Sequence, residues 1–112
     1  MRVSDLCPLL SARVLCGEPD KSVSGVYAGD LLSRAMSRVG AGSAWITIMA
    51  NINVVAVAEL ADPAVVVLAE DVILQPDALR AAKENDLCVI STPLSVFEIC
   101  CAIGRATEGR EA

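Results

Sequence analysis

The chain has 112 residues, of which 54% are hydrophobic and 21% charged, and its formal net charge at pH 7 is −5. This length suits one domain with one core, and the hydrophobic content excludes an intrinsically disordered chain. Nucleic acid is excluded as a partner by the acidic charge and the 3% aromatic content, because phosphate backbones need clustered Lys and Arg and single strands need aromatic stacking platforms.

No apolar stretch of the sequence predicts a membrane segment. The run 44–58 is interrupted by Asn51 and Asn53, and the run 64–69 is short, whereas a spanning helix needs about 20 predominantly apolar residues. The segment 6–16 has charged residues ahead of it and inside it, unlike a secretion signal. We therefore expect a cytoplasmic protein without a membrane partner.

The chain contains five cysteines and no histidine. Without histidine, catalysis by a Ser-His or Cys-His pair is excluded. The cysteines form no Cys-x-x-Cys pair, so a zinc site is not predicted, and no Walker-type phosphate loop is present. The sequence therefore predicts no catalytic residue, no metal and no cofactor. A redox role for Cys100 or Cys101 is an alternative that the sequence leaves open.

The sequence predicts strands and helices that alternate along the chain. Aliphatic runs bounded by turn residues predict strands at 12–16, 23–28, 45–49, 64–68 and 87–90. Apolar spacing and capping residues predict helices at 31–39, at 51–60, from Pro76 to 84, and from Thr92 or Ser95 to about 105. Residues 1–22 are expected to be a variable lead-in followed by the first strand, 23–106 the main α/β domain, and 107–112 a tail.

Three of these boundaries depend on single polar residues. Asp30 is predicted to cap the first of these helices. The segment 51–60 contains valines that favour a strand, but its length, alanines and candidate asparagine caps favour a buried helix. The last helix has two possible starts, one at Thr92 followed by proline and one at Ser95 with Glu98 in a capping box.

This alternation of strands and helices predicts an α/β fold. We expect a single layered domain in which helices pack on a mostly parallel sheet of four to five strands. Runs of Val, Ile, Leu and Ala without polar alternation support parallel strands, which are buried on both faces.

Polar residues follow several predicted strands where each strand ends. Because the carboxyl ends of parallel strands meet at one edge of the sheet, beside helix N-termini, these residues are candidates for binding a small ligand. The candidates are Gly29, Asp30, Asn51, Asn53, Ser91 and Thr92. Local roles are the alternative: capping for the asparagines and a tight turn for the glycine.

The same segments resemble the DRTGG domain family. The similar residues are Gly25, the run Gly29-Asp-Leu-Leu-Ser33, Trp45-Ile-Thr47, the run from Asn51 to Ala58, and the run from Ser91 to Glu98. The resemblance covers about residues 23–105, although the literal Asp-Arg-Thr-Gly-Gly run is absent. It implies a small α/β regulatory or dimerising module, of the kind found between nucleotide-sensing domains of some inorganic pyrophosphatases, with a fold related to the N-terminal domain of HPr kinase.

We therefore expect a protein that is not an enzyme: a regulatory, ligand-sensing module that forms a homodimer and binds a nucleotide-like small molecule. The alternatives are a nucleotide- or phosphometabolite-binding enzyme subunit and a redox-linked partner protein.

Overall fold

Five strands form one sheet in the order β1-β5-β4-β3-β2 in the computed structural model, which describes residues 1–108. Strands β2 to β5 are parallel to their neighbours, and β1 is antiparallel to β5. The strands are β1 (Arg13–Cys16), β2 (Val26–Ala28), β3 (Ala44–Thr47), β4 (Val65–Leu68) and β5 (Val89–Ser91). The predicted α/β domain with a mostly parallel sheet is confirmed.

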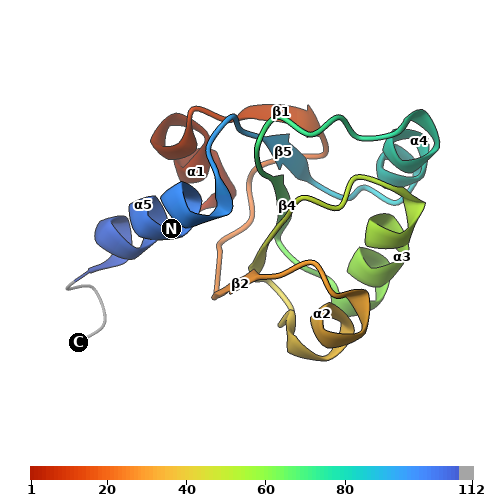
Figure 1. Ribbon diagram of the computed structural model, residues 1–112, viewed down its shortest axis with the longest axis horizontal. Helices are drawn as coiled ribbons and strands as arrows, with labels where there is room; N and C mark the ends of the chain where they lie inside the picture. Colours follow the sequence, from red (N-terminus) through yellow and green to blue (C-terminus); the bar gives the residue numbers. More distant parts are fainter. Residues whose placement is uncertain (109–112) are drawn as a thin grey trace.

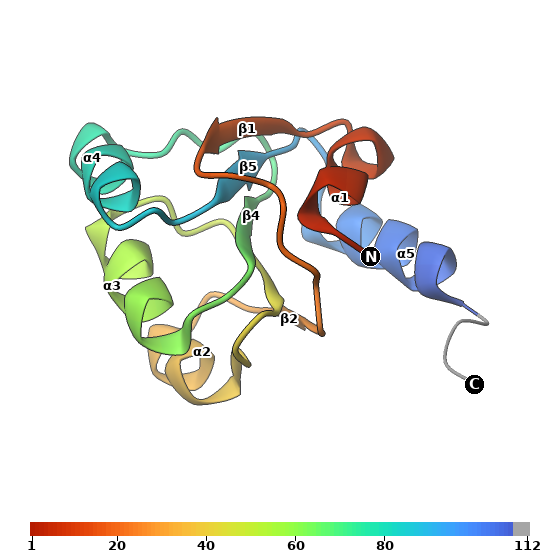
Figure 2. The same ribbon diagram turned by 180° about the vertical axis from the view of Figure 1, so that it is seen from behind.

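Helices cover both faces of this sheet (Figures 1 and 2). The helices are α1 (Val3–Leu10), α2 (Leu32–Arg38), α3 (Ile52–Ala61), α4 (Pro76–Glu84) and α5 (Val96–Thr107). Helices α2, α3 and α4 pack on one face, and α1 and α5 pack on the other. The sheet therefore lies between two helical layers.

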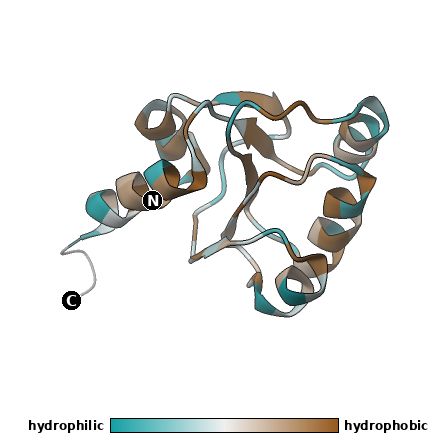
Figure 3. Cartoon of the chain, in the orientation of Figure 1, coloured by the Kyte–Doolittle hydropathy of each residue, from teal (hydrophilic) through white to brown (hydrophobic). Residues whose placement is uncertain are grey.

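The two central strands are buried along their whole length. Successive side chains of a strand point to opposite faces, so Trp45 and Val66 pack against α2 to α4, whereas Ile46 and Val67 pack against α1 and α5. Figure 3 shows strongly hydrophobic colouring along β4 and β5. This double burial explains why the strand sequences show no polar alternation.

Two of the uncertain boundaries are settled by hydrogen bonds. Residues 52–61 form the helix α3, with Asn51 as N-cap, so burial outweighs the strand propensity of its valines. Helix α5 starts after Ser95, where the Ser95 hydroxyl accepts from the Glu98 amide and the Glu98 carboxylate accepts from the Ser95 amide. The capping box is thus confirmed, and the start at Thr92 is wrong.

The predicted cap of α2 is also wrong. The N-cap of α2 is Leu31, and no side chain caps this helix. Asp30 instead directs its carboxylate to β3, where it accepts a hydrogen bond from the Thr47 hydroxyl. A bond to a buried strand replaces the local cap because Asp30 lies at the end of β2, beside β3.

Helix α1 lies where the sequence predicted only a lead-in. Val3, Leu6 and Leu10 are fully buried and follow helical spacing, and the Asp5 carboxylate accepts from the Arg2 amide at the start of the helix. These residues pack against the sheet and α5. The division of the chain at residue 22 stays a prediction. Of the predicted tail, Thr107 ends α5, and 109–112 lie outside the described residues.

Within residues 1–108, no helix is both long and apolar enough to span a bilayer.

Two glycines allow a matched test of the backbone after β1. Gly17 has φ +81°, and a Cβ there would lie 2.5 Å from the Cys88 Cα atom. Gly17→Ala should therefore lower the free energy of unfolding by at least about 2 kcal/mol, because left-handed strain and a backbone clash combine. Gly104 lies in α5 with open space around it, so Gly104→Ala should raise the free energy by about 0.5–1 kcal/mol. Urea titration measures the free energy of unfolding of both variants. Equal changes in the two would contradict the close contact between Gly17 and Cys88.

Candidate functional site

The six candidate residues lie along the edge where the parallel strands end, but in two separate groups. Gly29, Asp30, Asn51 and Asn53 lie on the segments that follow β2 and β3, and Ser91 and Thr92 lie at the end of β5. Strand β4 separates the groups, since it lies between β3 and β5 in the sheet. The structure therefore supports two distinct local sites at this edge.

Asp30 ties β2 to the segment after β3. Its Oδ1 atom accepts hydrogen bonds from the Thr47 hydroxyl at 2.6 Å and the Ile48 amide at 3.0 Å. The Thr47 hydroxyl accepts in turn from the Met49 amide at 3.1 Å. This network leaves an exposed carboxylate at the end of β2, which disfavours an anionic ligand at this point.

Gly29 contributes its backbone to the same network. Its amide donates to the Ile46 carbonyl at 3.1 Å, and its carbonyl accepts from the indole Nε1 of the buried Trp45 at 3.0 Å. A Cβ at this position would lie 2.9 Å from the Tyr27 hydroxyl oxygen. Gly29 therefore closes the β2–β3 loop by a close approach that a larger residue would crowd.

Asn51 and Asn53 form the start of α3. The Asn51 side chain accepts from the Asn53 amide at 3.0 Å, which confirms the capping alternative. The Asn53 side chain is exposed in the first turn of the helix. The side-chain NH2 group of Asn51 and the side chain of Asn53 are then left to contact a ligand.

Ser91 and Thr92 face opposite sides of the sheet. Thr92 is fully buried; its hydroxyl donates to the Leu10 carbonyl at 2.6 Å and accepts from the Leu94 amide at 3.1 Å. Thr92 therefore joins β5 to α1. Ser91 is only 4% exposed, and its hydroxyl has no hydrogen-bond partner among residues 1–108, yet it lines a hollow.

This hollow lies between β1, β5 and α4 and has a volume of about 200 Å³. Its walls are Arg13, Leu15, Val72, Ile73, Leu74, Leu79 and Ser91. Arg13 is the direct register partner of Ser91 across the β1–β5 pair. A cation, a serine hydroxyl and an aliphatic wall thus come together without a carboxylate in the lining, a combination suited to a small ligand that carries both an anionic and an apolar part.

Sequence reasoning missed Arg13. Because β1 is antiparallel to β5, the amino end of β1 lies beside the carboxyl ends of the other strands. A search of the residues that follow predicted strands could not find it. The sequence gives little indication that β1 is antiparallel. A short apolar run predicts a strand but not the direction in which that strand runs in the sheet.

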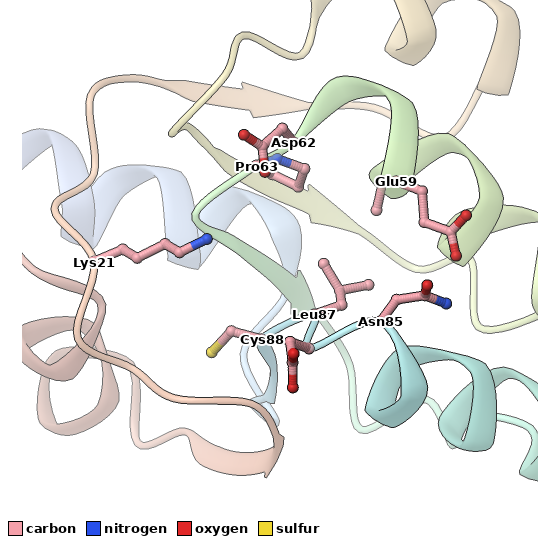
Figure 4. Close-up of a pocket in the computed structure, with 9 residues that line it drawn as sticks. Lys21, Glu59, Asp62, Pro63, Asn85, Leu87 and Cys88 are labelled. Carbon is pink, nitrogen blue, oxygen red and sulfur yellow. The ribbon is translucent and has the colours of Figure 1, made fainter.

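A larger groove lies at the opposite edge, before β4 and β5 (Figure 4). Its volume is about 350 Å³, and it adjoins a second hollow of about 380 Å³ that shares Lys21, Asp86 and Cys88. Lys21 extends into it from the loop before β2, whereas Glu59 and Asn85 lie on the side of α3 and α4 (Figure 4). Carboxylates outnumber the one lysine in its lining, and the described residues contain no group of three or more Cys, Asp or Glu that could hold a metal ion.

Cys88 forms part of this groove wall as an unreactive thiol. It is 5% exposed, and burial raises its pKa to about 11, with smaller contributions from Cys16 and Cys7. The Cys16 thiol is also buried and donates to the Leu87 carbonyl at 3.3 Å. Both act as small hydrophobic residues.

A solved structure similar to this chain is that of the CBS and DRTGG domains of the regulatory region of Clostridium perfringens pyrophosphatase, complexed with the activator diadenosine tetraphosphate. The TM-score is 0.71 at 16% sequence identity, and the match covers 90% of this chain and 45% of that chain. This chain thus spans less than half the length of that regulatory region. No family profile matches the chain, and no curated protein matches its sequence. The likeness shows a CBS/DRTGG-like α/β fold.

Removal of the Asp30 carboxylate tests the network at the end of β2. Asp30→Ala should lower the free energy of unfolding by about 1–3 kcal/mol, since two hydrogen bonds to a charged acceptor are lost. Asp30→Asn keeps one acceptor oxygen and should cost less. Glu84→Ala, on the exposed last turn of α4, is the control and should change the free energy by less than about 0.5 kcal/mol. An Asp30→Ala variant as stable as this control would contradict the structural role.

The raised pKa of Cys88 predicts slow alkylation of the native protein. At pH 8 about one Cys88 thiol in a thousand is a thiolate if its pKa is about 11, and only the thiolate reacts. Iodoacetamide labelling followed by peptide mass spectrometry should show Cys88 modified more slowly than Cys101, with the Cys88 rate rising as the pH approaches 11. In urea the difference should disappear. Fast labelling of native Cys88 at pH 8 would contradict the burial and the raised pKa of this thiol.

Proposed function

We propose that this chain is a non-catalytic regulatory module that senses a nucleotide-like small molecule and pairs with a second copy of itself. The observation that carries the proposal is its likeness, over 90% of the chain, to a regulatory region complexed with a nucleotide activator. The absence of histidine from the sequence excludes a Ser-His or Cys-His catalytic pair.

Among the six candidate residues, we propose Ser91 as the main ligand contact. Its hydroxyl has no partner among the described residues, whereas the polar groups of Asp30, Asn51 and Thr92 already bond to the backbone or to Thr47. Arg13 would supply the positive charge for an anionic group of the ligand. Gly29 and Asn53 belong to the other half of the edge, where a longer ligand would extend.

The size of the hollow limits what it encloses. At about 200 Å³ it is smaller than the ~300–1,000 Å³ pockets of drug-sized ligands. One end of a nucleotide, with its charge at Arg13 and its apolar part against Leu15 and Leu74, would fill it. The rest of such a ligand would lie outside, along the strand ends.

Exposed apolar side chains support the proposed pairing. Val26 on β2 and Leu31, three residues after its end, are 46% and 65% exposed. The mean hydropathy of the chain is +0.56, and some of its large apolar residues lie outside the core. A second copy would cover part of this surface. The redox alternative has less support, because burial and the neighbouring Cys101 raise the pKa of Cys100, and redox-sensing thiols have lowered pKa values.

A thermal-shift screen tests ligand sensing. Mononucleotides, dinucleoside polyphosphates and phosphorylated metabolites are added to the wild-type protein, and a ligand at 100 times its Kd should stabilise the fold by about 2.7 kcal/mol. Ser91→Ala and Arg13→Gln should each reduce this shift, since both line the hollow. Arg38→Gln, on the exposed end of α2, is the matched control and should retain it. A full screen without stabilisation would contradict the proposed function, and shifts unchanged in both hollow variants would contradict the site.

A further inference from the structure

The outer edge of β2 is an unprotected sheet edge. The register pairs Val26 with Ala44 and Ala28 with Ile46. The Ala44 amide donates to the Gly25 carbonyl, and the Gly29 amide donates to the Ile46 carbonyl. In a parallel ladder, alternate residues of a strand bond to the same neighbour, so the backbone groups of residues 25, 27 and 29 face β3.

The backbone groups of Val26 and Ala28 consequently face outward. Each residue presents one N–H donor and one C=O acceptor on the edge. Val26 is 46% exposed, and no heavy atom lies within 4 Å of the position of a Cβ on Gly25. Among residues 1–108 these two donors and two acceptors have no hydrogen-bond partner.

The other outer strand of the sheet, β1, differs from β2 in two ways. Strand β1 contains an irregularity in register between Val14 and Cys16 and carries the charged Arg13. Bulges and charged side chains are the common means by which proteins prevent edge pairing. Strand β2 has neither, and no residue from Ser22 to Gly29 is charged. In a chain of net charge −5, this uncharged segment allows a second copy to approach without bringing like charges together.

We propose that the second copy binds along β2, so that β2 and its symmetry mate pair antiparallel about a two-fold axis at Tyr27. This inference rests on the pairing in the proposed function and specifies its surface. The two copies of Val26 and Ala28 then exchange four hydrogen bonds, because each Val26 lies opposite the Ala28 of the other copy. The two five-stranded sheets become one ten-stranded sheet.

Only this register pairs the outward groups of β2 with those of its symmetry mate and with no residue outside the strand. A shift by one pair in one direction would place Val26 opposite Asp30, which lies beyond the end of β2 at Ala28. A shift in the other direction would place Ala28 opposite Ser24, whose amide already donates to the Gly42 carbonyl. Beside the edge, an apolar hollow of about 330 Å³ lined in part by Val23, Val26 and Ile103 leaves room for apolar contacts between the copies.

Light scattering of edge variants tests the proposal. The wild-type protein should have twice the chain mass of 11.7 kDa at micromolar concentration. Val26→Pro removes one outward donor and is compatible with an edge strand, so it should have the mass of one chain, with an unchanged circular dichroism spectrum. Val26→Lys, which adds a charge to the edge, should also be monomeric and remains informative if the proline variant does not fold. Leu60→Lys, at an exposed position on α3, should remain dimeric.

Cross-linking tests the register. Cα atoms of directly opposed residues in a non-hydrogen-bonded antiparallel pair are about 4.5 Å apart, a spacing that a disulfide spans. Tyr27→Cys should therefore form a 27–27′ disulfide between copies on oxidation with copper–phenanthroline in air, mapped by mass spectrometry, whereas Leu60→Cys should not.

The outcomes separate the two proposals. A monomeric wild-type protein overturns the proposed pairing and this inference together. A dimeric wild type with dimeric Val26→Lys and no 27–27′ cross-link overturns the β2 interface alone. A dimer lost in Val26→Lys and cross-linked through Tyr27→Cys supports both.

Discussion

Burial of both faces of β3 and β4 is the constraint on which the rest of the structure depends. Every residue of these strands is buried, so helices must cover both sides of the sheet. Parallel neighbours require crossover connections, and these bring the strand ends to one edge and the strand starts to the other. The sheet faces are filled by core side chains. Polar function is therefore confined to the two ends of the strands and to the two outer strands.

Most polar groups at the strand ends serve the fold. Asp30, Asn51 and Thr92 each accept from or donate to backbone groups where a strand gives way to a loop or helix. Such groups are costly to leave unpaired when they are buried. A polar residue at a strand end is therefore weak evidence of a ligand site by itself. Ser91 differs because it is buried, lines a hollow and has no partner in the described part of the chain.

The fold class was predictable because aliphatic runs and helix caps are local signals. Asn51 and Ser95 act as the caps that the sequence indicated. The interactions of Asp30 and Arg13 were not predictable, since they depend on which strand lies next to which. Asp30 bonds to Thr47 across the β2–β3 pair, and Arg13 reaches Ser91 only because β1 runs antiparallel to β5. Helix α1 was missed although Val3, Leu6 and Leu10 have helical spacing, because its short sequence also fits a lead-in.

The proposed ligand site and the proposed pairing surface lie at opposite ends of one rigid sheet. The hollow is at the β1–β5 end and the pairing edge is β2, the last strand of the order. In a ten-stranded sheet the two hollows, each between a β1 and a β5 strand, would be about eight strand spacings apart, or about 38 Å. A ligand shifts an equilibrium only if it binds the two states with different affinity, and nothing in the hollow contacts β2. A ligand signal would therefore leave the module at the β1 end, through Arg13 and the exposed segment around Ile73, while pairing at β2 would hold two such ends at a fixed separation.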